Sequence, residues 1–211
     1  MSGDDLVSII GVSIRDQVIR SQLSSWIAGI RDVPKRYFIV NAFDEAVAFL
    51  GLILGAYFGG FLSAKILLTS IVNAGIAMCV SGFTAAILIE EAELARILEP
   101  LRPKLVYLRG DVLRRIERLG RSHIFKSGLA SGLAALISSL LVSLPYLISV
   151  EGLISVNDAF SFSIIIVVIL LFILGMVLGK TAGNRELRYC LATVMAGLVT
   201  GFLCMLLGFI E

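Results

Sequence analysis

The chain has 211 residues, of which 58% are apolar and 16% are charged, and its mean hydropathy is +0.96. A water-soluble domain of this size cannot bury that much apolar surface, so the composition excludes an ordinary soluble protein. The net charge of +2 says little by itself. The arginines between the second and third apolar stretches fit topology and lipid anchors better than nucleic-acid ligands, so we expect no nucleic-acid partner.

Five long stretches are almost free of charge and follow one another from residue 37 onward. Each is long enough, at roughly 20 residues or more, to cross a hydrocarbon core of about 30 Å as a helix. Lipid tolerates only helices or closed barrels, and these stretches are too long for barrel strands. We therefore expect an all-α integral membrane protein with a transmembrane domain over residues 37–210. The predicted spans are about 37–62, 66–89, 127–150, 159–179 and 189–210.

Two further segments have helical amphipathic patterns. Residues 1–36 predict a cytoplasmic N-terminal helix, and residues 90–126 predict a short cytoplasmic helical segment between the second and third spans. Each apolar face either lies on the inner membrane surface against anionic lipid or packs on the cytoplasmic ends of the bundle. The sequence leaves both arrangements open. The apolar positions are Ile19, Leu23, Trp26, Ile27 and Ile30 in the first segment, and Leu105, Leu108, Val112, Ile116 and Leu119 in the second.

The basic residues indicate the orientation. All of them except Lys65 lie in the N-terminal segment, in the link between spans two and three, or in the link between spans four and five. Five spans put these three regions on one side, which the positive-inside rule makes cytoplasmic. We expect a cytoplasmic N-terminus and an outside C-terminus in the cell membrane, with a vacuolar membrane as the alternative.

Asp44 and Glu45 stand side by side in the first predicted span. A charged side chain at the bilayer centre costs about 2.5–3.5 kcal/mol on insertion scales, so an intramembrane carboxylate is a candidate functional site. Two adjacent acids indicate protons or hard metal ions as cargo. The alternative is a span that begins at Ala46 and leaves both acids at the membrane surface.

The helical repeat places Asp44 on a face rich in small residues. Residues within about 60° of Asp44 share this face, and glycines four residues apart let two helices approach closely in lipid. We therefore expect Asp44 to point toward a helix interface and away from lipid, with Glu45 at the edge of the same stripe. The other members of the stripe are Asn41, Ala48, Gly51, Gly55 and Gly59.

The second span carries further candidate ligands. Met78 is a thioether at mid-span, and Glu90 and Glu93 lie one helical turn apart at its cytoplasmic end, with Glu91 beside them. Depths counted along the helices put Met78 and Asp44 at similar heights. Carboxylate oxygen suits hard divalent ions and sulfur favours softer transition metals, so this pair predicts an Fe²⁺ or Mn²⁺ site. Taken singly, Met78 also fits a packing role, and the glutamates also fit a solvated helix end.

Four stretches in this order resemble the vacuolar iron transporter family, and together they cover roughly residues 37–208. The first and second spans carry AFDEAVAFLGLILGAY and GIAMCVSGFTAAILIEEAELAR. The third and fifth carry FKSGLASGLAALISSLLVSLPYLIS and RELRYCLATVMAGLVTGFLCMLLG.

The resemblance implies a five-helix protomer that forms a homodimer, with the ion path between the two copies of the first span. It implies export of Fe²⁺, Mn²⁺ or other divalent ions from the cytosol in exchange for protons. By position, Asp44 corresponds to the family's intramembrane aspartate and Met78 to its metal-contacting methionine. Glu90 and Glu93 correspond to the start of its cytoplasmic metal-binding segment, and Asn41 and Glu91 are additional candidate ligands.

We therefore predict a proton-coupled transporter of divalent transition metal, with the lipid bilayer and a second copy as partners and no permanently bound cofactor. One alternative is a transporter or channel for another ion on the same fold, and the other is a non-transporting membrane scaffold. An enzyme is not expected, because the chain has one histidine and no nucleophile motif.

Overall fold

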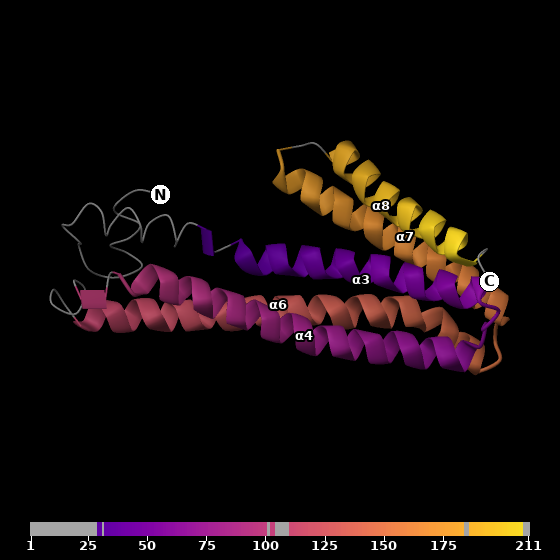
Figure 1. The fold of residues 1–211 in the computed structure, drawn as a ribbon, viewed down its shortest axis with the longest axis horizontal. Helices are drawn as coiled ribbons and strands as arrows, with labels where there is room; N and C mark the ends of the chain where they lie inside the picture. The colour runs from indigo at the N-terminus through magenta and orange to yellow at the C-terminus, as the bar shows by residue number, and fades with distance from the viewer. Residues whose placement is uncertain (1–28, 31, 101, 104–109, 184–185, 209–211) are drawn as a thin grey trace. The chain divides into compact units, whose positions relative to one another are not determined.

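A computed structural model describes residues 29–30, 32–100, 102–103, 110–183 and 186–208. The described ranges contain five long helices and no strand (Figure 1). All five helices are long and apolar enough to cross a membrane, which confirms the predicted all-α membrane fold. They are α3 (Val33–Phe58), α4 (Ala64–Leu98), α6 (Gly110–Val150), α7 (Val156–Thr181) and α8 (Glu186–Gly208).

Most of the two predicted amphipathic faces lie outside the described residues. Ile19, Leu23, Trp26 and Ile27 fall outside them, as do Leu105 and Leu108. Ile30, Ile116 and Leu119 are described, and Ile30 and Ile116 are buried.

The first helix has the predicted length of 26 residues, but it covers Val33–Phe58 instead of residues 37–62. A glycine cap ends it at Phe58. Gly60 adopts a positive φ of 70°. The amide of Phe61 donates to the carbonyl of Ala56 at 2.9 Å, and the amide of Gly60 donates to the carbonyl of Tyr57 at 3.2 Å. This is the Schellman pattern that satisfies the last carbonyls of a helix. Gly59 therefore belongs to the turn, and the helical part of the expected glycine stripe ends at Gly55.

The second and third helices are much longer than the spans predicted for them. α4 has 35 residues and α6 has 41, so at 1.5 Å per residue they extend for about 50 Å and 60 Å. Both exceed a hydrocarbon core of about 30 Å. Most of the described part of the predicted segment 90–126 therefore consists of extensions of α4 and α6.

α7 begins before the predicted residue 159 because its N-terminus has a capping box. The Ser155 hydroxyl accepts a hydrogen bond from the amide of Asp158 at 3.1 Å, and the Asp158 carboxylate accepts from the amide of Ser155 at 3.3 Å. Two amides that the helix leaves without partners are satisfied in this way.

The contacts divide the chain into two compact units. The first unit contains Met1–Tyr37 and Phe83–Ser131, and the second contains Phe38–Gly82 and Gly132–Glu211. α4 and α6 each contribute one half to each unit.

The second unit has a core of apolar side chains from α3, α4, α6 and α7. Phe49, Ile53, Ile71, Tyr146 and Leu171 are among its fully buried members. Large apolar side chains are exposed elsewhere on these helices and on α8, as expected where a helix faces lipid.

Small residues set the closest approaches between helices of the second unit. A Cβ atom added at Gly175 of α7 would lie 2.6 Å from the Cα atom of Cys190 in α8, and one at Gly75 of α4 would collide with Ser139 of α6. The Thr193 hydroxyl of α8 donates to the carbonyl of Leu171 in α7 at 2.9 Å. Such small residues and interhelical hydrogen bonds are what hold helices together in lipid.

We predict that Gly175→Ala destabilises the protein by about 1–3 kcal/mol, because the added methyl group meets the backbone of α8 and cannot be accommodated by a side-chain rotation. Thermal unfolding in detergent measures this loss. Gly201→Ala is the matched control, since its nearest neighbour is the end of the Leu54 side chain at 3.4 Å. Equal unfolding temperatures for the two variants would contradict the close packing of α7 and α8.

Candidate functional site

α3 presents its two acids in different directions. Glu45 is buried, with only 2% of its surface exposed, whereas Asp44 is exposed and Asn41 is half-buried. Successive side chains on a helix are 100° apart, so burying one acid turns its neighbour outward. The two adjacent carboxylates therefore lie in different environments within one protomer.

The surroundings of Glu45 on its helix are apolar. The neighbouring buried positions are Ala42, Ala46 and Phe49. Ala42 packs with Ala134 of α6 and Leu174 of α7. Glu45 Oε2 is buried and has no hydrogen-bond partner in the described part of the chain. A buried polar atom without a hydrogen-bond partner lowers the stability of a fold by about 1–3 kcal/mol. The burial of Glu45 is therefore not explained by a contribution to stability.

The face that carries Asp44 is only partly covered within the protomer. A Cβ atom at Gly51 would make ordinary contacts with Cys204 and Thr200 of α8, whereas one at Gly55 would have no neighbour within 4 Å. Asp44 and Gly55 are both exposed. This face of α3 therefore meets α8 at Gly51 and is uncovered in the single chain at Asp44 and Gly55.

Met78 lies on α4 in the same compact unit as Asp44 and is half-buried. The backbone carbonyl of Met78 accepts a hydrogen bond from the Ser81 hydroxyl at 3.2 Å. The thioether sulfur takes no part in this bond. No group of three or more His, Cys, Asp or Glu side chains suited to a metal ion occurs among the described residues. A cation site at Asp44 would need donors of other types, such as a thioether or an amide oxygen.

The predicted acidic cluster of α4 belongs to the first unit. Glu90 is half-buried and hydrogen-bonded to the hydroxyl of Tyr37 at the start of α3. Glu93 is exposed and forms an ion pair of 3.7 Å with Arg96. Sequence reasoning did not identify Tyr37 as a partner of Glu90, because residues so far apart in the chain have no spacing that links them.

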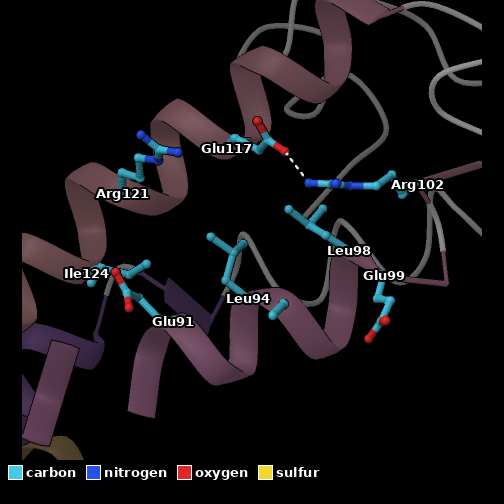
Figure 2. Close-up of a pocket in the computed structure, with 9 residues that line it drawn as sticks. Glu91, Leu94, Leu98, Glu99, Arg102, Glu117, Arg121 and Ile124 are labelled. Atoms are coloured by element: carbon cyan, nitrogen blue, oxygen red, sulfur yellow. Dashed lines mark hydrogen bonds and ion pairs between the residues drawn. The ribbon is translucent and has the colours of Figure 1, made fainter. Parts of the chain in front are cut away.

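A pocket between α4 and α6 is a second feature of the first unit (Figure 2). Its volume is about 470 Å³. Arg102 and Glu117 form an ion pair of 3.1 Å across it. Sequence reasoning did not identify this pocket either. Its lining residues are Glu91, Leu94, Ala95, Leu98, Glu99, Arg102, Glu117, Arg121 and Ile124.

We predict that Glu45→Leu raises the stability of the protein by about 1–3 kcal/mol, because it removes a buried oxygen that has no partner. Thermal unfolding in detergent measures the gain. Glu151→Leu is the control, since Glu151 is exposed and should change stability by less than about 0.5 kcal/mol. A large loss of stability in Glu45→Leu would show that the carboxyl group makes a structural contribution.

Comparison with known proteins gives one family and one relative. The model of the VIT family, the vacuolar iron transporters, matches residues 109–209. An uncharacterized protein of Methanocaldococcus jannaschii is 25% identical over 180 residues, which cover 82% of this chain and 87% of that protein. No solved structure matches the chain.

The family match covers α6, α7 and α8, whereas α3 and α4, with Asp44 and Met78, lie outside it. The VIT family is a family of membrane transporters of divalent metal ions. The resemblance to the vacuolar iron transporter family that the sequence suggested is therefore confirmed over residues 109–209.

Proposed function

We propose that this protein exports a divalent transition-metal ion, Fe²⁺ or Mn²⁺, from the cytosol in exchange for protons. The observation that carries the proposal is the contrast on α3 between an exposed Asp44 and a buried Glu45 without a partner for Oε2. The VIT family match supports the transport class.

In this proposal Asp44 holds the metal ion. Its carboxylate is the hard oxygen donor that divalent cations prefer, and the Met78 sulfur is the soft donor that favours transition metals over Ca²⁺ and Mg²⁺. The Asn41 amide oxygen lies one helical turn from Asp44 and is a further candidate ligand. Together these groups supply oxygen and sulfur donors of the type that Fe²⁺ and Mn²⁺ accept.

Glu45 carries the exchanged proton. A buried carboxyl group in apolar surroundings is far more easily accommodated neutral than charged, because apolar neighbours do not compensate the charge. A metal ion bound to the neighbouring Asp44 brings positive charge close to Glu45 and favours release of its proton. The two acids would in this way link metal occupancy to proton release.

The cytoplasmic entrance in this proposal consists of three acidic side chains of α4, those of Glu90, Glu91 and Glu93. Glu90 is held by Tyr37, and Glu93 by Arg96. These contacts orient the acids while leaving Glu91 exposed. Carboxylates at the entrance raise the local concentration of cations.

A second copy of the chain would cover the exposed part of α3. Asp44, Ala48 and Gly55 are exposed on one side of this helix, and small residues favour close helix contact in lipid. In the proposed homodimer both Asp44 carboxylates face the ion path. The N-terminus is cytoplasmic and the C-terminus is outside, in the cell membrane or, alternatively, a vacuolar membrane.

We predict that Asp44→Asn abolishes metal-dependent proton movement in proteoliposomes, because the amide keeps the shape of the carboxylate and removes the charge that binds the cation. Metal uptake and internal pH are measured together with fluorescent indicators. The dimer should persist in size-exclusion chromatography. Glu151→Gln, which alters an exposed acid outside the helices, is the control and should transport normally. Unchanged flux in Asp44→Asn would remove this residue from the mechanism.

We predict that Met78→Leu lowers the selectivity for Fe²⁺ and Mn²⁺ over Ca²⁺ and Mg²⁺, because leucine fills similar space and lacks the sulfur donor. Competition between these ions in the same flux assay measures the ratio. Met195→Leu, at an exposed position of α8, is the matched control. The role of Met78 as a ligand is excluded if its selectivity ratio equals that of the control.

A further inference from the structure

The pocket between α4 and α6 has an apolar floor and a charged rim. Leu94, Ala95 and Leu98 of α4 line it together with Ile124 of α6. In Figure 2 the Leu94 side chain points from α4 toward α6, whereas the Glu99 and Arg121 side chains point away from the space between the two helices. Leu98 and Ile124 are buried, but Ala95 is exposed, so part of the floor is open. An uncovered apolar floor of this kind is suited to receive apolar side chains from another segment.

One end of the pocket already contacts the segment that precedes α3. The imidazole of His123 hydrogen-bonds the backbone of Ile30, and His123 is the neighbour of Ile124 in the pocket lining. Ile30 is 7% exposed and is therefore packed in place. The chain that leads to α3 is held at the edge of the pocket by this contact.

Two contacts of described residues give the direction of the chain where it approaches α3. Tyr37 contacts Glu90, and Ile30 contacts His123. From Tyr37 back to Ile30, the chain therefore runs toward the end of the hairpin that α4 and α6 form. The pocket extends from Ile124 back to Glu117, about 10 Å along α6 at 1.5 Å per residue. A helix from Ile30 back to Leu23 has the same length.

We propose that residues 19–30 of this chain dock in the groove between α4 and α6 as a helix, with the apolar stripe of Ile19, Leu23, Trp26, Ile27 and Ile30 against the groove floor. This stripe repeats every three or four residues, as a helix packed on one face requires. The segment carries only one charged residue, Arg20, so little charge is buried on docking. The segment then joins the start of α3 to the α4–α6 hairpin.

Charge around the groove agrees with this occupant. Arg20 lies ten residues before Ile30, about 15 Å along a helix, which corresponds to the distal part of α4. Glu99 lies on that rim and is exposed. The opposite charges of Arg20 and Glu99 favour the docked direction.

Trp26 is the only tryptophan of the chain, so its fluorescence reports on this segment alone. The test uses the full-length protein in proteoliposomes and compares Ala95→Lys with Ala92→Lys. Both alanines are exposed on α4, but only Ala95 lines the pocket. A lysine at position 95 lies four residues from both Glu91 and Glu99, which keeps the helix stable.

We expect Ala95→Lys to shift the Trp26 emission to the red and to increase its quenching by acrylamide, because the lysine displaces the docked segment into water. Ala92→Lys should leave both quantities unchanged.

Brominated phosphatidylcholine should quench Trp26 weakly in the unmodified protein. Equal emission in the two variants and the unmodified protein would overturn the proposal, and so would an equal shift in both variants. Strong quenching by brominated lipid would also overturn it and assign the segment to the membrane surface. None of these readouts depends on transport activity.

Discussion

The structure depends on the close approach of helices through small side chains. Between helices that face lipid there is little hydrophobic driving force, so contact area and hydrogen bonds must supply the attraction. Gly175 of α7 lies against the backbone of α8, and Gly75 of α4 lies against Ser139 of α6. The packing of Ala42 of α3 with Ala134 of α6 and Leu174 of α7 turns one face of α3 inward, and Glu45 is the acid buried there.

The position of Glu45 is a consequence of this packing and supports the role proposed for it. Its apolar surroundings give Oε2 no partner, and a leucine would be a more stable occupant. Groups that a fold holds at the expense of stability are common at functional sites. The neighbouring Asp44 is exposed, which agrees with its proposed role as a cation ligand. In the proposed mechanism the two acids serve different ions although they are adjacent in sequence.

In the first unit, the long helices α4 and α6 pack against each other and make polar contacts. Gly120 and Gly128 of α6 permit close contact with Leu94, Phe83 and Ile87 of α4. The ion pair of Arg102 and Glu117 joins the end of this hairpin. The hairpin thus carries both Glu90, which is bound by Tyr37 of α3, and the groove beside Ile30.

The sequence by itself determined the five helices and the class of protein, because lipid requires long apolar helices whatever their packing. It also singled out Asp44 and Glu45, since acids are rare in such stretches. Spacing on one helix did not reveal that Glu45 is the buried acid or that Tyr37 binds Glu90. These depend on which neighbouring helices supply the contacts, and only the tertiary structure decides that. The early end of α3 at Phe58 likewise required the backbone conformation of Gly60.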